Sequence, residues 1–253
     1  MTTIEFKGVT KTFNNGFQAI QKTDLIINPG EFTVILGSSG AGKSTLLRMV
    51  NGLETPSQGE IFIDQRKLTP QNQHHIRAKV GMIFQQFNLV NRLNVMTNVL
   101  IGRSYYRRWW ESLFYLFSKQ DYKLAHWALE RVELTDKVWQ RANNLSGGQQ
   151  QRVAIARVLV QKPQIIIADE PVASLDPATS SEIMNLLFKI CKEDGVTVLA
   201  SLHQVNLAMQ FADRIIGIKQ GKIIFDDQPV NLLHNSLLET IYHKEDHENI
   251  HVA

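Results

Sequence analysis

Leu145-Ser146-Gly147-Gly148-Gln149 is the stretch that decides the fold, because of the two segments between which it stands. Upstream lies Gly37-Ser38-Ser39-Gly40-Ala41-Gly42-Lys43-Ser44, which fits the phosphate-binding pattern G-x-x-x-x-G-K-[ST]. Downstream, the apolar run Ile165–Ala168 ends in Asp169-Glu170. A glycine loop alone indicates only that some nucleotide is bound. Its order and spacing relative to LSGGQ and to an Asp-Glu pair at a strand end indicate a much narrower class of protein.

The glycine loop predicts phosphate binding by a simple physical route. Successive backbone N–H groups, unobstructed by side chains, converge on phosphate oxygens at the start of a helix. Lys43 then supplies a positive charge to the β- and γ-phosphates, and the Ser44 hydroxyl is placed to ligate Mg²⁺. Thr45, one residue further into the helix, is expected near the α-phosphate. The alternative is a glycine-rich strand-to-helix turn in which Lys43 and Ser44 occur by chance.

Acidic side chains follow the run Ile165–Ala168, which has the composition of a central strand in a parallel sheet. The carboxyl ends of such strands face the ligand crevice. We therefore expect Asp169 to hold Mg²⁺ through water and Glu170 to polarise the attacking water. His203 follows the next predicted strand and should emerge at the same edge, where it can donate a hydrogen bond to the γ-phosphate. The alternatives are two solvated acids and a structural histidine.

The hydrophobic pattern predicts one α/β domain across residues 1–253. Runs typical of buried strands alternate with helical segments, which favours a largely parallel sheet with crossover helices. We expect an α/β core over 1–87 and 161–230 that includes an N-terminal antiparallel β subdomain. A helical subdomain over 88–160 carries LSGGQ, and 231–253 form a C-terminal tail. The predicted strands are Thr3–Phe6, Asp24–Ile27, Phe32–Leu36, Glu60–Ile63, Val80–Phe84, Ile165–Ala168, Thr197–Ala200, Arg214–Ile218 and, after the turn Gln220-Gly221, Lys222–Phe225.

Composition and charge exclude several classes of protein. Hydrophobic residues make up 43% of the chain and charged residues 20%, as in ordinary globular proteins. The net charge of +3 is too small and too scattered to favour a nucleic-acid partner. Cys191 is interpreted as a small core residue rather than a reactive thiol. We find neither a signal peptide nor a run of about 18 apolar residues, and this pattern predicts a cytosolic protein.

The three segments together resemble the ATP-binding cassette (ABC) ATPases, and the likeness runs from residue 6 to about residue 225. It implies an ATPase with the P-loop NTPase core of the ABC type. Gln85 follows the strand that ends at Phe84, and it matches the family's glutamine that contacts Mg²⁺ and the attacking water. Gln86 is the neighbour that could be confused with it. Ser174-Leu175-Asp176 matches the D-loop, which crosses between subunits.

The resemblance also implies an aromatic residue ahead of the glycine loop that stacks on adenine. Phe13 fits best, and Phe17 is the runner-up. Most members of the family carry tyrosine at this place. The alternative for Phe13 is a core aromatic residue of the N-terminal sheet.

The LSGGQ signature predicts a homodimer. Ser146, Gly147 and Gly148 open a helix whose N-terminal N–H groups suit an anion, and Gln149 completes the motif. In the family, the helical subdomain holds this signature away from the glycine loop of its own chain. The resemblance therefore implies that the signature and Asp176 complete the ATP site of a second subunit. Two subunits would meet head to tail and bury two ATP molecules.

The segment 105–117 is the most unusual part of the chain. Tyr105-Tyr106-Arg107-Arg108-Trp109-Trp110 and Leu113-Phe114-Tyr115-Leu116-Phe117 make it far more aromatic than the rest. One interpretation is the hydrophobic core of the helical subdomain. Another is a surface that contacts a membrane permease, since aromatic residues and arginine are favoured at interfaces. Adsorption to a membrane surface and stacking on single-stranded nucleic acid are weaker alternatives.

Several stretches look like the phosphonate and phosphite branch of the importer ATPases. They are Phe84–Val90, Thr97–Arg103, Asp169–Pro177 and Ser201–Val205, with the long aromatic insert after Gly102. The likeness implies an ATPase on the cytoplasmic face of the inner membrane, bound to permease subunits and indirectly to a solute-binding protein. Another small-anion or amino-acid importer is the alternative within transport. A nucleotide-gated scaffold that moves no solute is the alternative from another class.

Overall fold

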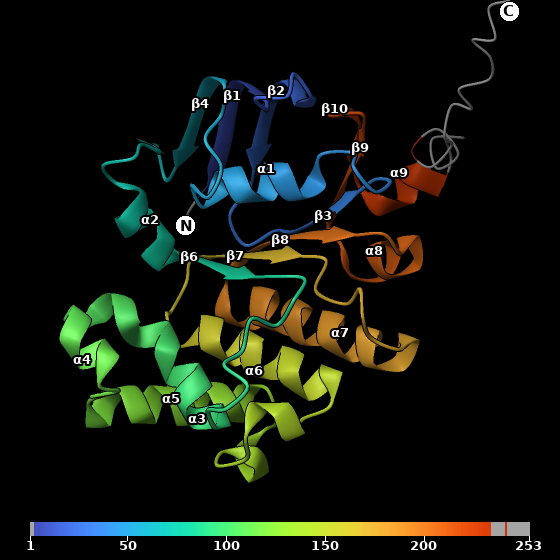
Figure 1. The fold of residues 1–253 in the computed structure, drawn as a ribbon. Helices are drawn as coiled ribbons and strands as arrows, with labels where there is room; N and C mark the ends of the chain where they lie inside the picture. Colours follow the sequence, from blue (N-terminus) through green and yellow to red (C-terminus); the bar gives the residue numbers. More distant parts are fainter. Residues whose placement is uncertain (1–2, 234–240, 242–253) are drawn as a thin grey trace, which may run out of the picture.

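The computed structural model of this protein describes residues 3–233 and residue 241. Figure 1 shows two sheets, with one helix between them and a layer of helices below the larger one. The smaller sheet has the strand order β2-β1-β4-β5, and the larger has β10-β9-β3-β8-β7-β6. The strands are β1 (Ile4–Thr12), β2 (Gln18–Ile27), β3 (Phe32–Leu36), β4 (Gln58–Ile63), β5 (Arg66–Lys67), β6 (Val80–Ile83), β7 (Ile165–Asp169), β8 (Thr197–Leu202), β9 (Arg214–Lys219) and β10 (Lys222–Asp227). The helices are α1 (Lys43–Val50), α2 (Gln73–Lys79), α3 (Val95–Leu100), α4 (Trp109–Leu113), α5 (Lys119–Arg131), α6 (Gly147–Leu159), α7 (Pro177–Asp194), α8 (Val205–Phe211) and α9 (Pro229–Leu233), with short 3-10 helices η1 (Ile101–Tyr106), η2 (Thr135–Lys137) and η3 (Ala142–Asn144).

The larger sheet is parallel except for its edge strand β10, which pairs antiparallel with β9. Strands β3, β6, β7 and β8 are buried along their whole length, as expected when helices cover both faces. Alternate residues face different cores. Ile35 and Ile167 belong to the core that contains α1, whereas Val34 and Ile166 belong to the core that contains α6 and α7. The carboxyl ends of β3, β8 and β7 therefore lie side by side above a packed interior.

The N-terminal sheet is antiparallel, but β1 and β2 are longer than the predicted strands Thr3–Phe6 and Asp24–Ile27. The pairing of β1 with β2 shifts register between Phe6 and Val9, where Gly8 has φ +56°. Such bulges break the period of two on which sequence-based strand prediction depends. Helix α1 lies between this sheet and the larger one (Figure 1).

Helices make up the stretch between β6 and β7. In Figure 1, α3, α5 and α6 lie below the larger sheet, and α6 packs on both β6 and α7. The first turn of α5 is closed by a reciprocal cap between Ser118 and Asp121. The helices from α3 to α6 lie within the range 88–160 over which the sequence predicts a helical subdomain.

The C-terminal tail, residues 231–253, lies mostly outside the described residues. Ile241 is buried, and a Cβ built on Gly217 of β9 would lie 2.7 Å from its Cδ1 atom. At this point the tail packs on the larger sheet. Within residues 3–233 and at residue 241, we find no helix long and apolar enough to span a bilayer.

Cys191 is buried near the end of α7. Burial raises the pKa of its thiol to about 11, so the group is protonated at neutral pH. Its Sγ atom lies 3.5 Å from the carbonyl oxygen of Gly30. The interpretation of Cys191 as a small core residue agrees with these surroundings.

Candidate active site

A hollow of about 330 Å³ opens where the glycine loop meets residues that follow β6, β7 and β8. Its lining residues are Phe17, Ala19, Ser39, Gly40, Ala41, Gly42, Lys43, Ser44, Thr45, Gln85, Glu170 and His203. Gln85 is part of this lining, and Gln86 is not. Residues far apart in the sequence therefore converge at one edge of the larger sheet.

Two glycines of the loop are required by close backbone approaches. A Cβ built on Gly37 would lie 2.4 Å from the carbonyl oxygen of Ile218, and one built on Gly42 would lie 2.5 Å from that of Ala19. Gly42 also has φ +108°, a conformation that L side chains rarely adopt. Packing against neighbouring backbone therefore demands glycine at both positions, in addition to any demand from phosphate.

Lys43 opens α1 and is buried. Its Nζ donates to the carbonyl oxygens of Gly37 (2.9 Å) and Ser38 (3.1 Å), and it lies 3.7 Å from Glu170 Oε1. Burial lowers the pKa of Lys43, while the negative charges of Glu170 and Asp169 oppose that shift. The ammonium group is thus held inside its own loop, facing the two carboxylates.

Asp169 is the buried carboxylate at the end of β7. Its Oδ1 accepts hydrogen bonds from the hydroxyls of Ser44 (2.7 Å) and Ser201 (3.0 Å). Ser201 stands opposite Asp169 in the β7–β8 register, and its Oγ also accepts from the Glu170 N–H at 2.9 Å. Ser201 is not among the site residues predicted from the sequence. A serine at the end of an apolar strand was the available signal.

Glu170 has a left-handed backbone, with φ +49°. This conformation is uncommon for a residue other than glycine, and such residues cluster at active sites. Glu170 Oε1 lies 2.6 Å from His203 Nε2, which in turn lies 3.4 Å from Lys43 Nζ. The structure brings Lys43, Glu170 and His203 together. We call the bonds of Lys43 to its loop, of Ser44 to Asp169 and of Glu170 to His203 the self-paired arrangement.

Phe17, and not Phe13, stands at this hollow. Phe17 is 54% exposed and lines the hollow beside Ala19. Phe13 is half-buried, and the Lys11 ammonium lies 5.0 Å from the centroid of its ring. The chain turns between the two residues, with the Phe13 N–H donating to the Phe17 carbonyl. The turn thus carries the second phenylalanine, and not the first, to the hollow.

The signature opens α6. Ser146 Oγ accepts from the Gln149 N–H at 3.3 Å, and Gln149 Oε1 accepts from the Ser146 N–H at 3.1 Å. A Cβ built on Gly147 would lie 3.3 Å from Leu175 of the D-loop. Helices α6 and α1 belong to cores on opposite faces of the larger sheet. Within the described residues, the signature does not line the glycine-loop hollow of its own chain.

The D-loop leads into α7, which packs against the start of α6. Asp176 caps α7 by accepting from the Thr179 N–H at 3.0 Å, and bonding to Thr179 lowers the pKa of Asp176. A Cβ built on Gly148 would lie 2.5 Å from Thr179 Cγ2. Glycine at position 148 thus allows the signature to lie against the first turn of α7.

A family model described as ABC transporter matches residues 20–173 of this chain. The chain belongs to the ABC transporter family. It is 56% identical over 247 residues to the phosphonates import ATP-binding protein PhnC 2 of Trichodesmium erythraeum, with 97% of this chain and 95% of the relative covered. It is 57% identical over 245 residues to the phosphonates import ATP-binding protein PhnC of Thiobacillus denitrificans, with 97% and 94% covered.

Solved ABC cassettes share the whole fold. A dimeric ATP-binding cassette in a post-hydrolysis state, bound to ADP and Pi, matches with a TM-score of 0.78 and 39% identity, over 89% of this chain and 98% of its own. A nucleotide-free ATP-binding cassette from an ABC transporter matches with a TM-score of 0.85 and 26% identity, over 97% and 100%. These likenesses confirm the fold class and the ATPase activity predicted from the sequence.

In this cassette the aromatic segment is anchored by a buried carboxylate. Asp121 is 1% exposed and accepts from Arg103 Nε (3.0 Å), from Arg107 and from the Ser118 N–H (2.9 Å). Arg103 also donates to the Val160 carbonyl at 2.9 Å. Burial opposes ionisation of Asp121, but the bonds from Ser118 and Arg103 and the charge of Arg107 outweigh it and lower the pKa. This arginine clamp joins the segment before α4 to the first turn of α5.

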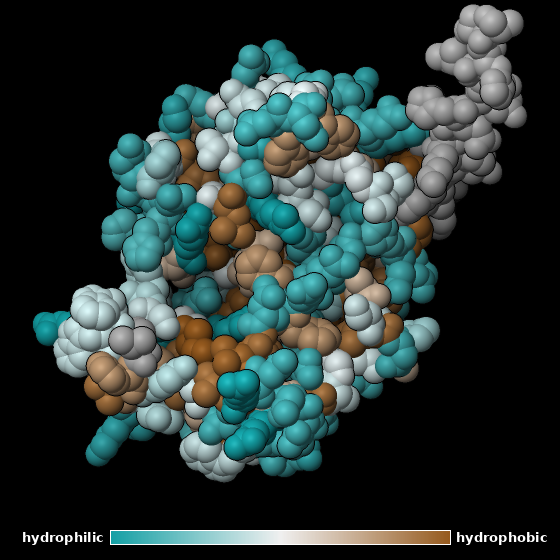
Figure 2. All heavy atoms as spheres, in the orientation of Figure 1, coloured by the Kyte–Doolittle hydropathy of each residue, from teal (hydrophilic) through white to brown (hydrophobic). Residues whose placement is uncertain are grey.

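The aromatic side chains held by the clamp are exposed. Trp109 is 79% exposed and Phe114 68%, and Trp110, Tyr115 and Leu116 are also exposed. Helix α4 projects from one corner of the cassette (Figure 1), where Figure 2 shows mixed pale and brown surface. The interpretation as subdomain core is wrong for these side chains. Phe117 does pack against the core, and the Leu113 side chain lies outside the described residues.

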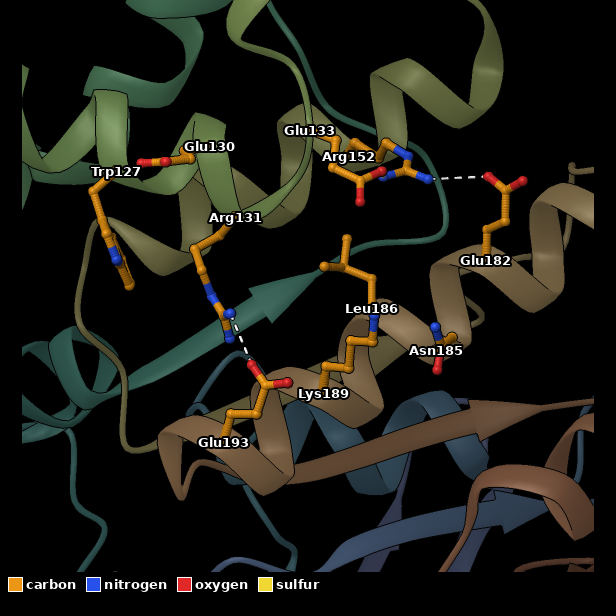
Figure 3. A pocket seen from close by; sticks show the side chains of 10 residues that line it. All are labelled: Trp127, Glu130, Arg131, Glu133, Arg152, Glu182, Asn185, Leu186, Lys189 and Glu193. Carbon is orange, nitrogen blue, oxygen red and sulfur yellow. Dashed lines mark hydrogen bonds and ion pairs between the residues drawn. The ribbon is translucent and has the colours of Figure 1, made fainter.

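A larger hollow of the cassette, about 660 Å³, lies among α5, α6 and α7 (Figure 3). Its charged residues pair across the groove: Arg131 of α5 with Glu193 (2.8 Å) and Arg152 of α6 with Glu182 (3.0 Å), both acids lying on α7. No residue that the sequence predicted for the ATP site lines it. Two arginine–glutamate pairs cross it, so we interpret it as a joint between the helical part and α7.

Proposed function

We propose that this chain is the Mg²⁺-dependent, ATP-hydrolysing subunit of an importer, and that two copies close head to tail around two ATP molecules. One observation carries the proposal: Glu170 Oε1 lies 2.6 Å from His203 Nε2 and 3.7 Å from Lys43 Nζ at the mouth of the glycine-loop hollow. Phosphoryl transfer uses positioned groups of this kind and needs little covalent help.

Each member of this group has a distinct role. Lys43 exchanges its bonds to the loop carbonyls for bonds to the β- and γ-phosphates. Glu170 orients the attacking water and accepts a hydrogen bond from it, a contribution that is typically 10²–10⁴-fold. His203 holds the Glu170 carboxylate and donates a hydrogen bond to the γ-phosphate. Gln85, from the next strand end, orients the same water.

The oxygen atoms at the start of α1 suit Mg²⁺, which prefers hard oxygen ligands. Ser44 Oγ and Asp169 Oδ1 lie 2.7 Å apart, so both can face one ion, directly or through water. Gln85 lines the same hollow and adds an amide oxygen. When bound, Mg²⁺ neutralises charge on the β- and γ-phosphates.

The rest of the ATP molecule is bound by neighbouring segments. The backbone of residues 37–42 surrounds the phosphates, Thr45 lies at the α-phosphate, and Phe17 stacks on adenine. The signature, residues 146–149, and Asp176 complete the site of the partner subunit. Neither the signature nor Asp176 lines the glycine-loop hollow of their own chain, which supports this exchange, as does the likeness to a dimeric cassette.

We propose phosphonate or phosphite as the imported solute, because relatives at 56% and 57% identity are named phosphonates import ATP-binding proteins. The partners are then permease subunits of the membrane and, indirectly, a solute-binding protein. The chain would lie on the cytoplasmic face of the inner membrane. Exposed aromatic residues of α4, held rigidly by the arginine clamp, would contact the permease.

A deletion strain tests the solute. We expect loss of growth on methylphosphonate, 2-aminoethylphosphonate or phosphite as sole phosphorus source, with growth on phosphate retained. A copy of the gene carrying Glu170→Gln should fail to restore growth, whereas the wild-type copy should succeed. Growth of the deletion strain on every reduced phosphorus source would contradict the proposed solute. It would favour an importer of another solute, or a scaffold that moves none.

A further inference from the structure

Gln151 on α6 is a fully buried residue whose amide has no protein partner. It is 0% exposed, and within the described part of the chain neither its Oε1 nor its Nε2 atom is hydrogen-bonded. Buried side-chain amides are usually paired, and an unpaired one costs free energy. The adjacent Gln150 shows the usual case, because its Nε2 donates to the carbonyls of Ala142 (3.1 Å) and Leu145 (3.2 Å).

The face of α6 that carries Gln151 points toward the loop after β6. Gly147 lies about one turn earlier on the same face, and a Cβ built there would lie 3.7 Å from the Phe87 ring. Val158, about two turns later on that face, contacts the position of Gly81 in β6. Gln151 therefore lies between the end of β6 and the signature.

Residues 85–88, which we call the Gln85 loop, connect β6 to the helical part. Arg157 of α6 donates to the carbonyls of Phe87 (2.9 Å) and Asn88 (2.6 Å), so this helix already holds acceptors of the loop. Its backbone N–H groups, by contrast, donate to no group in the described chain. The loop, whose Phe87 ring lies near the start of α6, thus has N–H donors without an acceptor, and the buried amide oxygen near the start of that helix has no donor. Because Gln85 lines the ATP hollow, a bound nucleotide acts directly on this loop.

We propose that Gln151 is a positioning residue for ATP hydrolysis. Its amide is unpaired in the self-paired arrangement, and its Oε1 accepts a hydrogen bond from a backbone N–H of the Gln85 loop when ATP draws Gln85 toward the γ-phosphate. The new bond removes the cost of an unpaired buried oxygen and so favours the closed, ATP-bound dimer. Gln151 follows Gln149 on α6, so the bond also sets the signature relative to Gln85. This inference rests on the proposed ATPase function.

Matched methionine variants test the idea, because methionine keeps an unbranched side chain and removes the amide. We would place Gln151→Met and Gln150→Met separately in the full-length Glu170→Gln protein, which retains ATP. Without nucleotide, Gln151→Met should keep or raise the melting temperature, whereas Gln150→Met should lower it by breaking two bonds. With ATP and Mg²⁺, Gln151→Met should weaken dimerisation about a hundredfold, because the dimer contains two Gln151 residues and each lost net hydrogen bond costs about tenfold. Gln150→Met should dimerise like its parent.

Hydrogen exchange of the Gln85 loop gives a readout that a purely structural role would not change. ATP should slow exchange of a loop N–H in Glu170→Gln and should fail to do so when Gln151→Met is added. If Gln151→Met melts as low as Gln150→Met, or dimerises as tightly as its parent, the inference is overturned. A parent that does not dimerise with ATP would overturn the proposed function, whereas an unaffected Gln151→Met dimer would overturn the inference alone.

Discussion

The sheet edge at the ATP hollow and the α4 segment differ in the environment of their side chains. At the sheet edge, polar groups bond one another, with Ser44 Oγ 2.7 Å from Asp169 and His203 Nε2 2.6 Å from Glu170. In α4, apolar groups face solvent above a polar anchor, and Trp109 is 79% exposed. A ligand at the edge must exchange existing bonds, whereas a partner at α4 would bury new apolar surface. The polar site and the proposed docking surface are therefore separate parts of this cassette.

The largest effect should come from the polar edge. We expect Glu170→Gln to bind ATP normally, to lower the turnover number by about 10²–10⁴-fold, the usual contribution of a positioned base, and to trap an ATP-bound dimer. ATPase assays and gel filtration with ATP and Mg²⁺ measure both effects. His203→Ala should likewise bind ATP and hydrolyse slowly, whereas Lys43→Ala should lose affinity. A monomeric Glu170→Gln protein with near wild-type turnover would remove Glu170 from its role.

The second-largest effect should come from the arginine clamp. It should change the free energy of unfolding rather than the turnover number. Asp121→Ala leaves Arg103 and Arg107 without their shared carboxylate, so we expect unfolding to become easier by about 3–5 kcal/mol. Asp136→Ala, which removes an exposed carboxylate paired with Lys137, should change little. Denaturant unfolding of both variants checks the difference.

Acid should reduce the effect of Asp121→Ala. The folded-state pKa of Asp121 lies below its ordinary value of 3.8, so its stabilisation is present above that value and is lost as the pH falls through the folded pKa. The stability gap between wild type and variant should therefore narrow at low pH. A gap that stays constant down to pH 2 would contradict the clamp.

The next prediction tests which of the two phenylalanines, Phe17 or Phe13, stacks on adenine. Phe17→Ala should weaken ATP binding by about 1–3 kcal/mol, the usual effect of removing an aromatic side chain that stacks on a base. Phe13→Ala, away from the hollow, is the matched control and should bind ATP almost normally. Titration with a fluorescent ATP analogue and with ATP decides. Equal affinities for the two variants would place adenine elsewhere.

The smallest effect on the isolated protein should come from the exposed aromatic residues. Replacing Trp109 and Trp110 by Ala should change the free energy of unfolding by only about 0.5 kcal/mol, since surface substitutions rarely cost more. Basal ATPase activity should persist, while solute uptake and permease association fall. Loss of about 3–5 kcal/mol, as for a buried tryptophan, would show that these residues pack internally and do not form a docking surface.

The residues that the sequence analysis placed well carry strong local patterns. The apolar runs Phe32–Leu36 and Ile165–Ala168 are buried parallel strands, and the polar residues after such strands meet because their carboxyl ends share an edge. This rule and the glycine-loop motif are enough to predict that Lys43, Glu170 and His203 lie close together.

Features set by irregular backbone escaped the sequence analysis. The arginine clamp joins Arg103 and Arg107 to Asp121 across η1 and α4, where no helical or strand period relates the partners. The place of Phe17 depends on a tight turn, which a sequence pattern locates but does not orient. Exposure of Trp109 could not be read from composition, because aromatic clusters are as typical of cores as of interfaces.

The strand that leads into the glycine loop is synthesised well before the strands with which it pairs. Strand β3, Phe32–Leu36, pairs with residues 198–202 on one side and 214–217 on the other, and the loop also accepts a bond from the Gly221 N–H at Ala41. The ribosome therefore releases the phosphate-binding motif long before the two strands that flank β3 exist. Contacts so distant in the chain form slowly. We expect the glycine loop of the nascent protein to stay unfolded until most of the chain has been made. ATP therefore cannot bind there and stabilise early folding intermediates.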